Sequence, residues 1–379
     1  VPIIERLRFL GIFSNNLDEF FQVRYATVKR IAESGFEKDN SKNKKAINLL
    51  DQITNKVIRL QTKSSKILDS IQFSLKKEGI YFINENEVKD SQQEFLKDFF
   101  IRKISPALVT IILSKRKKYD FTDNKAFLIA NMSFKTQENI HAIVEIPENI
   151  SRFVVLPKKT NKQYIMLIDD IIRYHLNIIF SYFNYDRIDA HMVKITRDAE
   201  IDIDDIDLSK SYIKKISEYV RKRKYSNPVR LVYDKSISKT SLELIIKKLK
   251  ITSNDSLIPG ARYHQRRDYM DFPDLSRSDL LYKRKQPLNI QDFHIESNLL
   301  NQISNKDFLM YTPYHSFSYL VAFLRQSAID PNVRSIKITL YRLSKNSNVI
   351  SSLINAAKNG KKVLVQIELQ ARFDEENNI

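Results

Sequence analysis

Two arginines near the end of the chain could bind an anion. Arg342 and Arg372 lie just after apolar, strand-like segments, and an arginine side chain offers a planar fork that matches phosphate oxygens. Ligands of parallel sheets bind beyond the carboxyl ends of the strands. The two positions therefore predict a phosphate site. In an alternative interpretation Arg372 forms a surface ion pair with Asp374 or Glu375, and the spacing favours neither.

A second group of cationic side chains lies within residues 260–268, beside an aromatic residue. Such a cluster could line a path for a polyanion, because closely spaced cations release the counterions of a phosphate chain. A solvated basic loop explains the same residues equally well. The candidate residues of the path are Arg262, His264, Arg266, Arg267 and Arg342.

Asn16 has two interpretations. With Glu19 three residues later it resembles a capping box, so Asn16 could simply begin a helix. Its side-chain amide could also contact the edge of a purine. The residues alone favour the cap.

An acidic run suggests a metal site, but it lacks the glycine and the terminal glutamate of an EF-hand loop. We therefore expect an exposed turn there. Its members are Asp198, Glu200, Asp202, Asp204, Asp205 and Asp207.

Several catalytic signatures are absent from the sequence. Gly360-Lys361-Lys362 lacks the earlier glycine of a P-loop, and no G-x-G-x-x-G occurs. The six histidines form neither H-E-x-x-H nor H-x-K, and the chain has no cysteine. Thiol nucleophiles, disulfides and cysteine-ligated zinc are therefore excluded.

The first 79 residues have helical periodicity. A polar break at residues 14–16 separates two apolar stretches, and a long packing seam follows until Gly79. This predicts a small antiparallel helical unit. The expected seam residues are Leu50, Ile53, Val57, Leu60, Ile67, Ile71 and Leu75.

The rest of the chain mixes helices and strands, which predicts a multidomain α+β protein. Strands are expected at 126–132, 140–146, 153–156 and 229–233, and helices at 168–182, 211–224 and 240–250. The last part alternates strands at 308–311, 333–340 and 362–369 with helices at 317–327 and 349–358, which predicts a parallel sheet. The expected domains are 1–79 (helical), 80–306 (α+β) and 307–379 (α/β).

The composition favours anionic partners. The chain of 379 residues has 63 Lys+Arg and 45 Asp+Glu, a net charge of +18, and its hydrophobic share of 42% excludes wholesale disorder. No apolar run approaches the ~18 residues that a membrane span requires. We therefore expect a cytoplasmic protein. Because the chain starts with Val1 and stops as a further strand–helix unit is due, we expect it to be part of a longer protein.

Several blocks of the sequence resemble bacterial polyphosphate kinases of the first type. The stretch ERLRFLGIFSNNLDEFF at residues 5–21 resembles the N-terminal signature of that family. ITRDAE at 195–200 and GARYHQRRDYMDFP at 260–273 resemble motifs of its head domain. YTPYHSF at 311–317, IKITLYR at 336–342, NGKKV at 359–363 and ELQARFDE at 368–375 resemble the start of its first catalytic domain.

The resemblance implies an N-terminal helical domain, a head domain and the start of a phospholipase-D-like catalytic domain. It implies reversible transfer of the ATP γ-phosphate to inorganic polyphosphate, with Mg²⁺, through a phosphohistidine that lies beyond Ile379. It assigns the ATP base contact to Asn16 and a magnesium-associated role to Arg372, which would act through the phosphates because a guanidinium cannot ligate a cation. It further implies a homo-oligomer, peripheral membrane association and no specific nucleic acid partner.

Two other functions are consistent with the same residues. One is a non-catalytic module that binds polyanions through its basic surface. The other is a phospholipase-D-like phosphodiesterase. H-x-K segments beyond Ile379 would favour the kinase.

Overall fold

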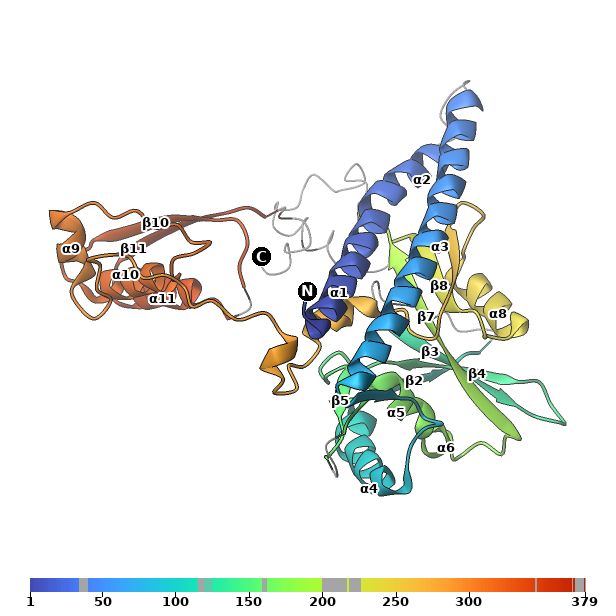
Figure 1. The fold of residues 1–379 in the computed structure, drawn as a ribbon. Helices are drawn as coiled ribbons and strands as arrows, with labels where there is room; N and C mark the ends of the chain where they lie inside the picture. The colour runs from blue at the N-terminus through green and yellow to red at the C-terminus, as the bar shows by residue number, and fades with distance from the viewer. Residues whose placement is uncertain are drawn as a thin grey trace. The chain divides into compact units, whose positions relative to one another are not determined.

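The described residues of the computed structural model fall into two units (Figure 1). One unit gathers the described residues of 1–202 and 222–282, and the other gathers those of 203–221 and 283–379. The structure describes residues 1–33, 40–114, 119, 121, 123, 125–158, 162–199, 217, 226–344, 346–369, 371 and 378.

The first unit begins with a helical rod. It runs without a break from α1 (Ile3–Phe20) through the π-helical turn η1 (Phe21–Tyr25) into α2 (Ala26–Glu33). The predicted break at residues 14–16 is therefore wrong, and so is the interpretation of Asn16 as a cap. The polar residues make up less than one turn of α1, and the buried stripe continues past them at Asp18 and Phe21.

The long helix α3 (Asn40–Lys77) lies beside this rod in the opposite direction (Figure 1). Leu7 of α1 packs near Leu75 of α3, whereas Phe21 packs near Leu50, so the helical hairpin that the periodicity predicts is confirmed. One seam residue is wrong: Ile67 is 41% exposed and its neighbour Leu68 is buried. Gly79 follows with φ of +77°, a conformation that glycine adopts at little cost.

A sheet of six strands forms the centre of the first unit. The order is β2-β4-β3-β7-β8-β9, with antiparallel pairs except for the parallel pair β8–β9. The strands are β2 (Val109–Ile112), β3 (Ala126–Ser133), β4 (Ile140–Glu145), β7 (Arg187–Arg197), β8 (Pro228–Asp234) and β9 (Ser256–Gly260).

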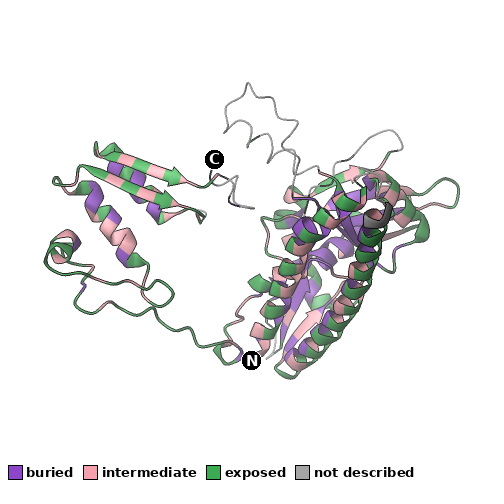
Figure 2. Ribbon diagram, turned by 90° about the horizontal axis from the view of Figure 1, so that it is seen from above, coloured by how far each residue is buried: buried purple, intermediate pink, exposed green. Residues whose placement is uncertain are grey.

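Both faces of this sheet are covered, which explains the continuous apolar run of β3. Leu128 and Ala130 contact one core cluster, whereas Phe127 and Ile129 contact another on the opposite face. Successive side chains of a strand point to opposite faces, so a strand in the middle needs apolar residues at every position. Figure 2 shows these buried residues gathered inside the unit. Helix α8 (Lys239–Leu249) packs on the Phe127 face through Ile245.

A smaller sheet, β1-β6-β5, completes the first unit. The helix expected at 168–182 is two short helices, because the chain breaks at His175 and the second helix ends at Ile179. The helix expected at 211–224 lies outside the described residues, apart from Ser217. The remaining elements are β1 (Ile80–Ile83), α4 (Asp90–Phe99), η2 (Phe100–Ile104), η3 (Ser105–Ala107), β5 (Phe153–Val155), β6 (Gln163–Leu167), α5 (Ile168–Tyr174), α6 (Leu176–Ile179), η5 (Arg266–Asp271) and η6 (Ser278–Leu280).

The second unit contains a parallel strand pair covered on one face. Along β10 (Ser335–Leu340) and β11 (Lys362–Ile367) exposed and half-buried residues alternate (Figure 2). The half-buried face packs on α10 (Ser318–Ile329) and α11 (Asn348–Lys358). The other face of this pair is exposed, although parallel sheets are normally covered on both faces.

One predicted strand of the second unit is wrong. Residues 308–311 have no strand structure in the described chain, and Phe308 instead stacks on Phe293 at 4.3 Å. Phe308 therefore packs in a small hydrophobic cluster that includes a residue of α9 (Leu299–Asn305), and it does not belong to a sheet. The predicted fold class, multidomain α+β with N-terminal helices and a phospholipase-D-like part with parallel strands, is confirmed.

Candidate functional site

The segment after β9 brings the predicted basic residues against helix α1. Two glycines allow this close approach. A Cβ atom at Gly260 would lie 2.5 Å from Cε1 of His264, and one at Gly11 would lie 2.7 Å from the backbone nitrogen of Met270. Real Cβ atoms do not approach other atoms so closely. Gly11 therefore lets α1 pack on η5, and Gly260 leaves room for the His264 ring.

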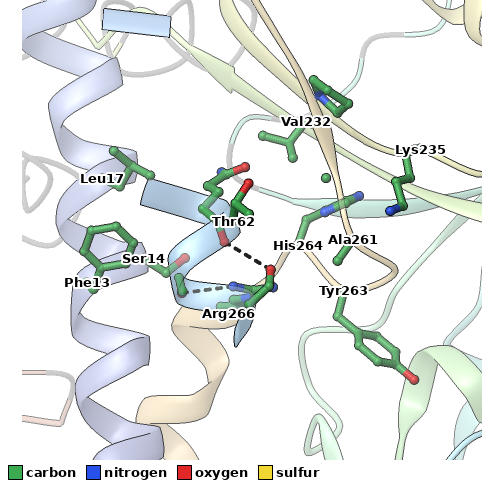
Figure 3. Close-up of a pocket in the computed structure, with 15 residues that line it drawn as sticks. Phe13, Ser14, Leu17, Thr62, Val232, Lys235, Ala261, Tyr263, His264 and Arg266 are labelled. Atoms are coloured by element: carbon green, nitrogen blue, oxygen red, sulfur yellow. Dashed lines mark hydrogen bonds between the residues drawn. The ribbon is translucent and has the colours of Figure 1, made fainter. Parts of the chain in front are cut away.

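A pocket opens between α1, α3 and this segment (Figure 3). Its volume is about 240 Å³. We call it the hydroxyl-lined pocket, because serines and a threonine from two helices contribute to its wall. It is lined by Phe13, Ser14, Leu17, Gln61, Thr62, Ser64, Ser65, Val232, Lys235, Pro259, Gly260, Ala261, Tyr263, His264 and Arg266.

Arg266 and His264 provide the main polar groups of this pocket. Arg266 donates from Nη1 to Oγ of Ser64 at 2.9 Å and from Nη2 to Oγ of Ser65 at 2.7 Å (Figure 3). His264 is 9% exposed, and its Nε2 has no hydrogen-bond partner in the described residues. Burial lowers the pKa of His264 to about 3, so its ring is neutral at physiological pH.

Arg262 has a different environment from Arg266, although only three residues lie between them. Its guanidinium pairs with Glu85 and with Oδ1 of Asp170, the latter at 2.9 Å. Asp170 is fully buried, and it also accepts from Arg173 at 2.7 Å and from the Tyr263 hydroxyl at 2.6 Å. Arg262 is thus held by carboxylates.

Arg267 lines a second pocket, with a volume of about 550 Å³. We call it the mixed-charge pocket. Arg152 also lines this pocket. Its Nη2 atom lies 2.6 Å from Oδ2 of Asp169, and its Nε atom lies 3.5 Å from Oδ2 of Asp268. Its other charged or amide-bearing lining residues are Asn15, Lys125, Glu148, Asn149, Gln265, Arg267 and Asp271.

Asn16 lies on α1 between the residues that line the two pockets. Ser14 and Leu17 line the hydroxyl-lined pocket, and Asn15 lines the mixed-charge pocket. Asn16 itself is exposed, and its side chain makes no hydrogen bond within the part of the chain that the structure describes. Glu19, the expected capping partner, accepts from Asn15 instead at 3.1 Å. The side-chain amide of Asn16 therefore contributes no hydrogen bond to the helix in the described residues.

A buried ion cluster fixes α1 to the central sheet. Asp18 accepts from Lys194 of β7 and from Arg230 of β8, and all three are almost fully buried. Burial lowers the pKa of Lys194 to about 8, and the charge of Asp18 opposes part of this shift. Burial would raise the pKa of Asp18, but the two cations outweigh that effect and lower it. The cluster holds Asn16, two residues away, at a fixed position on the unit.

The remaining predicted site residues fall elsewhere. Arg342 is in the second unit, exposed, with its guanidinium 5.8 Å from the centre of the Tyr341 ring. Arg372 lies outside the described residues. The structure therefore does not bring the five predicted path residues together: two line one pocket, one lines another, one is paired with carboxylates, and one is in the second unit.

The acidic run is only partly described. Asp198 is buried and paired with Arg30 of α2, so it does not lie in an exposed turn. The other members, Glu200 to Asp207, lie outside the described residues. Among the residues that the structure does describe, no group of three or more His, Cys, Asp or Glu could hold a metal ion.

Sequence reasoning missed the polar residues that line the hydroxyl-lined pocket from outside the basic segment: Ser14, Gln61, Thr62, Ser64, Ser65 and Lys235. One signal was present. Ser64 lies seven residues after Val57 and four before Leu68, so a hydroxyl occupies the buried stripe of α3. A polar residue in such a stripe indicates a polar partner, which here is Arg266.

The chain matches three family models in sequence order. They are the polyphosphate kinase N-terminal domain at residues 1–83, the middle domain at 91–272 and the C-terminal domain 1 at 298–379. No helix in the described ranges is long and apolar enough to cross a membrane.

Relatives with the same description match the entire chain. The polyphosphate kinase of Vibrio vulnificus (strain YJ016) is 38% identical over 100% of this chain and 54% of its own length. That of Escherichia coli (strain K12) is 36% identical over 100% of this chain and 56% of its own. The crystal structure of the polyphosphate kinase from Porphyromonas gingivalis matches with a TM-score of 0.74 and 28% identity, over 99% of this chain and 53% of that one.

The chain thus spans about half the length of the relatives that it matches. All three models, the relatives and the solved structure agree on one family and together account for both units. The chain belongs to the polyphosphate kinase family.

Proposed function

We propose that the full-length protein transfers the γ-phosphate of ATP reversibly to inorganic polyphosphate through a phosphohistidine, with the nucleophilic histidine beyond Ile379. The observation that carries this proposal is the end-to-end match to relatives described as polyphosphate kinases. The basic charge of +18 supports it, because both substrates are polyanions.

Within this reaction Asn16 would contact the base of ATP. Two features support the assignment. The side chain is exposed on a helix that buried charges hold in place, and it has no hydrogen-bond partner among the described residues. A pre-positioned amide loses little conformational freedom when it binds a ligand.

Magnesium would enter with the nucleotide. Phosphate oxygens are hard ligands that Mg²⁺ accepts readily, and the ion usually keeps few protein contacts. Arg372 would bind those phosphates and neutralise their charge, since its guanidinium has no lone pair for the metal. Bound there, Mg²⁺ would neutralise charge that develops during transfer.

The domain boundaries 1–79, 80–306 and 307–379, the cytoplasmic location, the homo-oligomer and the peripheral membrane association remain predictions.

The reaction is tested with γ-labelled ATP, Mg²⁺ and polyphosphate. We expect the full-length protein to incorporate label into the polymer and to carry acid-labile phosphate on a histidine. Polyphosphate binding without transfer would identify a binding module and contradict the proposal, as would hydrolysis of a phosphodiester.

The nucleotide contact is tested by Asn16→Ala. We expect ATP affinity to fall by about 5- to 150-fold, the equivalent of roughly 1–3 kcal/mol for a lost amide contact. The free energy of unfolding should stay level or rise by up to ~0.7 kcal/mol, because alanine is the better residue inside a helix. ATP titration and urea unfolding measure the two effects.

The matched control is Asn55→Ala, which removes an exposed amide from α3. It should leave ATP affinity unchanged. If Asn16→Ala folds normally and binds ATP as tightly as the unmodified protein, Asn16 is not a nucleotide contact.

A further inference from the structure

The hydroxyl-lined pocket contains cations but no acidic residue. Its two charged side chains are Lys235 and Arg266, and no aspartate or glutamate contributes to its wall. Lys235 is exposed, and within the described chain Arg266 hydrogen-bonds to hydroxyl groups and forms no ion pair with a carboxylate. Neither side chain forms an ion pair in the described residues, unlike Arg262, although the charge of Asp69 acts on Arg266 and opposes part of the lowering of its pKa by burial.

The hydrogen-bond donors of the pocket are only partly used. Thr62 donates to the backbone oxygen of Ile58, and Ser65 donates to that of Gln61. In contrast, Ser64 only accepts, from Arg266, and Ser14 makes no side-chain hydrogen bond in the part of the chain that the structure describes. These two hydroxyl groups can still donate to a ligand.

His264 supplies the observation that points most directly to a ligand. Its side chain is more than nine-tenths buried and its Nε2 atom has no partner among the described residues, yet the residue lines the pocket. Buried polar atoms almost always have a hydrogen-bond partner, and an exception calls for a missing water, ion or ligand. A neutral imidazole can donate one hydrogen bond from Nε2.

The size of the pocket restricts the ligand. Its volume of about 240 Å³ lies below the ~300–1,000 Å³ that sites for larger organic ligands usually have. Val232 and Pro259 form apolar wall beside the polar groups, and such walls strengthen electrostatic attraction by excluding water. The site thus suits a small, strongly charged oxyanion without a base or sugar.

We propose that the hydroxyl-lined pocket binds an inorganic phosphate anion, from orthophosphate to triphosphate in size. Arg266 and Lys235 would supply the charge, and Ser14, Ser64 and His264 would donate hydrogen bonds to the phosphate oxygens. The inference goes beyond the proposed function, because binding here needs neither ATP nor phosphoryl transfer. A bound anion would link α1, α3, the end of β8 and the segment after β9, so occupancy should stabilise the first unit.

The test is calorimetric titration of the purified protein with sodium triphosphate, at constant ionic strength maintained with chloride. Lys235→Glu and Thr62→Glu place a negative charge at exposed positions of the wall without disturbing the core. Each should weaken triphosphate binding by about tenfold or more, as charge reversal beside a bound anion does. His264→Phe keeps the ring shape, removes the donor and should also weaken binding.

The matched control is Lys63→Glu. It makes the same change in net charge at an exposed position of α3, next to Thr62 but outside the pocket wall. We expect less than a threefold effect on triphosphate affinity. If Lys63→Glu weakens binding as much as Lys235→Glu does, the anion is held by general surface charge and the proposal is wrong.

Two further arms separate this site from the proposed ATP contact. Asn16→Ala should leave triphosphate affinity unchanged, and saturating triphosphate should raise the thermal unfolding temperature of this variant as it does for the unmodified protein. If ATP displaces triphosphate competitively and Asn16→Ala weakens both, the pocket is part of the nucleotide site and the separate site is refuted. Should His264→Phe fail to fold, the two glutamate variants still decide the outcome.

Discussion

Arg262 and Arg266 belong to one short basic segment, yet they occupy opposite environments. Arg262 lies against Glu85 and the buried Asp170, whereas Arg266 faces the hydroxyl groups of Ser64 and Ser65. A cation already paired with carboxylates contributes to stability and has little capacity to attract a further anion. The comparison teaches that the value of a basic residue for binding depends on its three-dimensional neighbours, and not on its place in a basic run.

The half-buried His191 and the buried His264 show the same contrast. Burial lowers the pKa of His191, but hydrogen bonds and charges from Asp189 and Asp234 outweigh burial and raise it to about 9. Burial lowers the pKa of His264 to about 3, and the charge of Asp234, which makes no hydrogen bond to this ring in the described chain, opposes only part of the shift. The first histidine is a cation in a structural ion cluster, and the second is a neutral donor.

The largest expected effect comes from removing the carboxylate that Arg262 depends on. Asp170→Asn would leave Arg173 and Arg262 without their buried partner, and breaking a buried ion pair typically costs about 3–5 kcal/mol. Urea unfolding should show a loss of this order. The control Asp98→Asn, which removes an exposed partner of Arg102, should cost about 0.5 kcal/mol or less. If both variants lowered the free energy of unfolding equally, the buried carboxylate of Asp170 would contribute no more to stability than the exposed one of Asp98, and the contrast would be wrong.

A somewhat smaller effect is expected from the titration of His191. Its pKa is raised in the folded protein, so its stabilising contribution is complete below pH 6.5 and is lost as the pH rises through about 9. The loss should be on the order of 3 kcal/mol. Unfolding free energies measured from pH 6 to pH 10 test this, and His191→Gln should lack that part of the decline. A decline of the same size in the Gln variant would contradict the assignment.

The smallest effects compare the two arginines directly. Arg262→Gln should lower the free energy of unfolding by about 1–2 kcal/mol, because its guanidinium is one-third exposed, and it should leave triphosphate binding unchanged. Arg266→Gln should lose less stability, because glutamine can still donate to Ser64 or Ser65, but it should weaken triphosphate binding. If both variants weaken triphosphate binding, or if both lower only the free energy of unfolding, the proposed difference between the two arginines is wrong.

Much of the fold follows from periodicity in the sequence. The alternation along β10 and β11 and the helical stripes of α3, α8 and α11 are local patterns, and the structure confirms them. The errors arose where local chemistry misleads. A polar triplet within α1 looked like a helix end, and the apolar Phe308 looked like part of a strand although it packs against Phe293.

The candidate site could be predicted only in part. The residues of the hydroxyl-lined pocket come from α1, α3, β8 and the segment after β9, which are distant in sequence. Spacing indicated that Arg266 and His264 carry useful chemistry, but it could not show that Ser64 faces Arg266 or that Asp170 neutralises Arg262. Such facts depend on tertiary contacts that no short motif records.

The buried cluster of Asp18, Lys194 and Arg230 limits how this unit could be recombined with its relatives. A hybrid that takes its first helices from another protein would inherit or lose the acid at position 18 independently of the two cations on β7 and β8. Without that acid, two positive charges would remain in an apolar interior, and the hybrid would lose about 3–5 kcal/mol of stability however well its helices packed. In any such hybrid the residues at these three positions therefore have to come from the same parent protein.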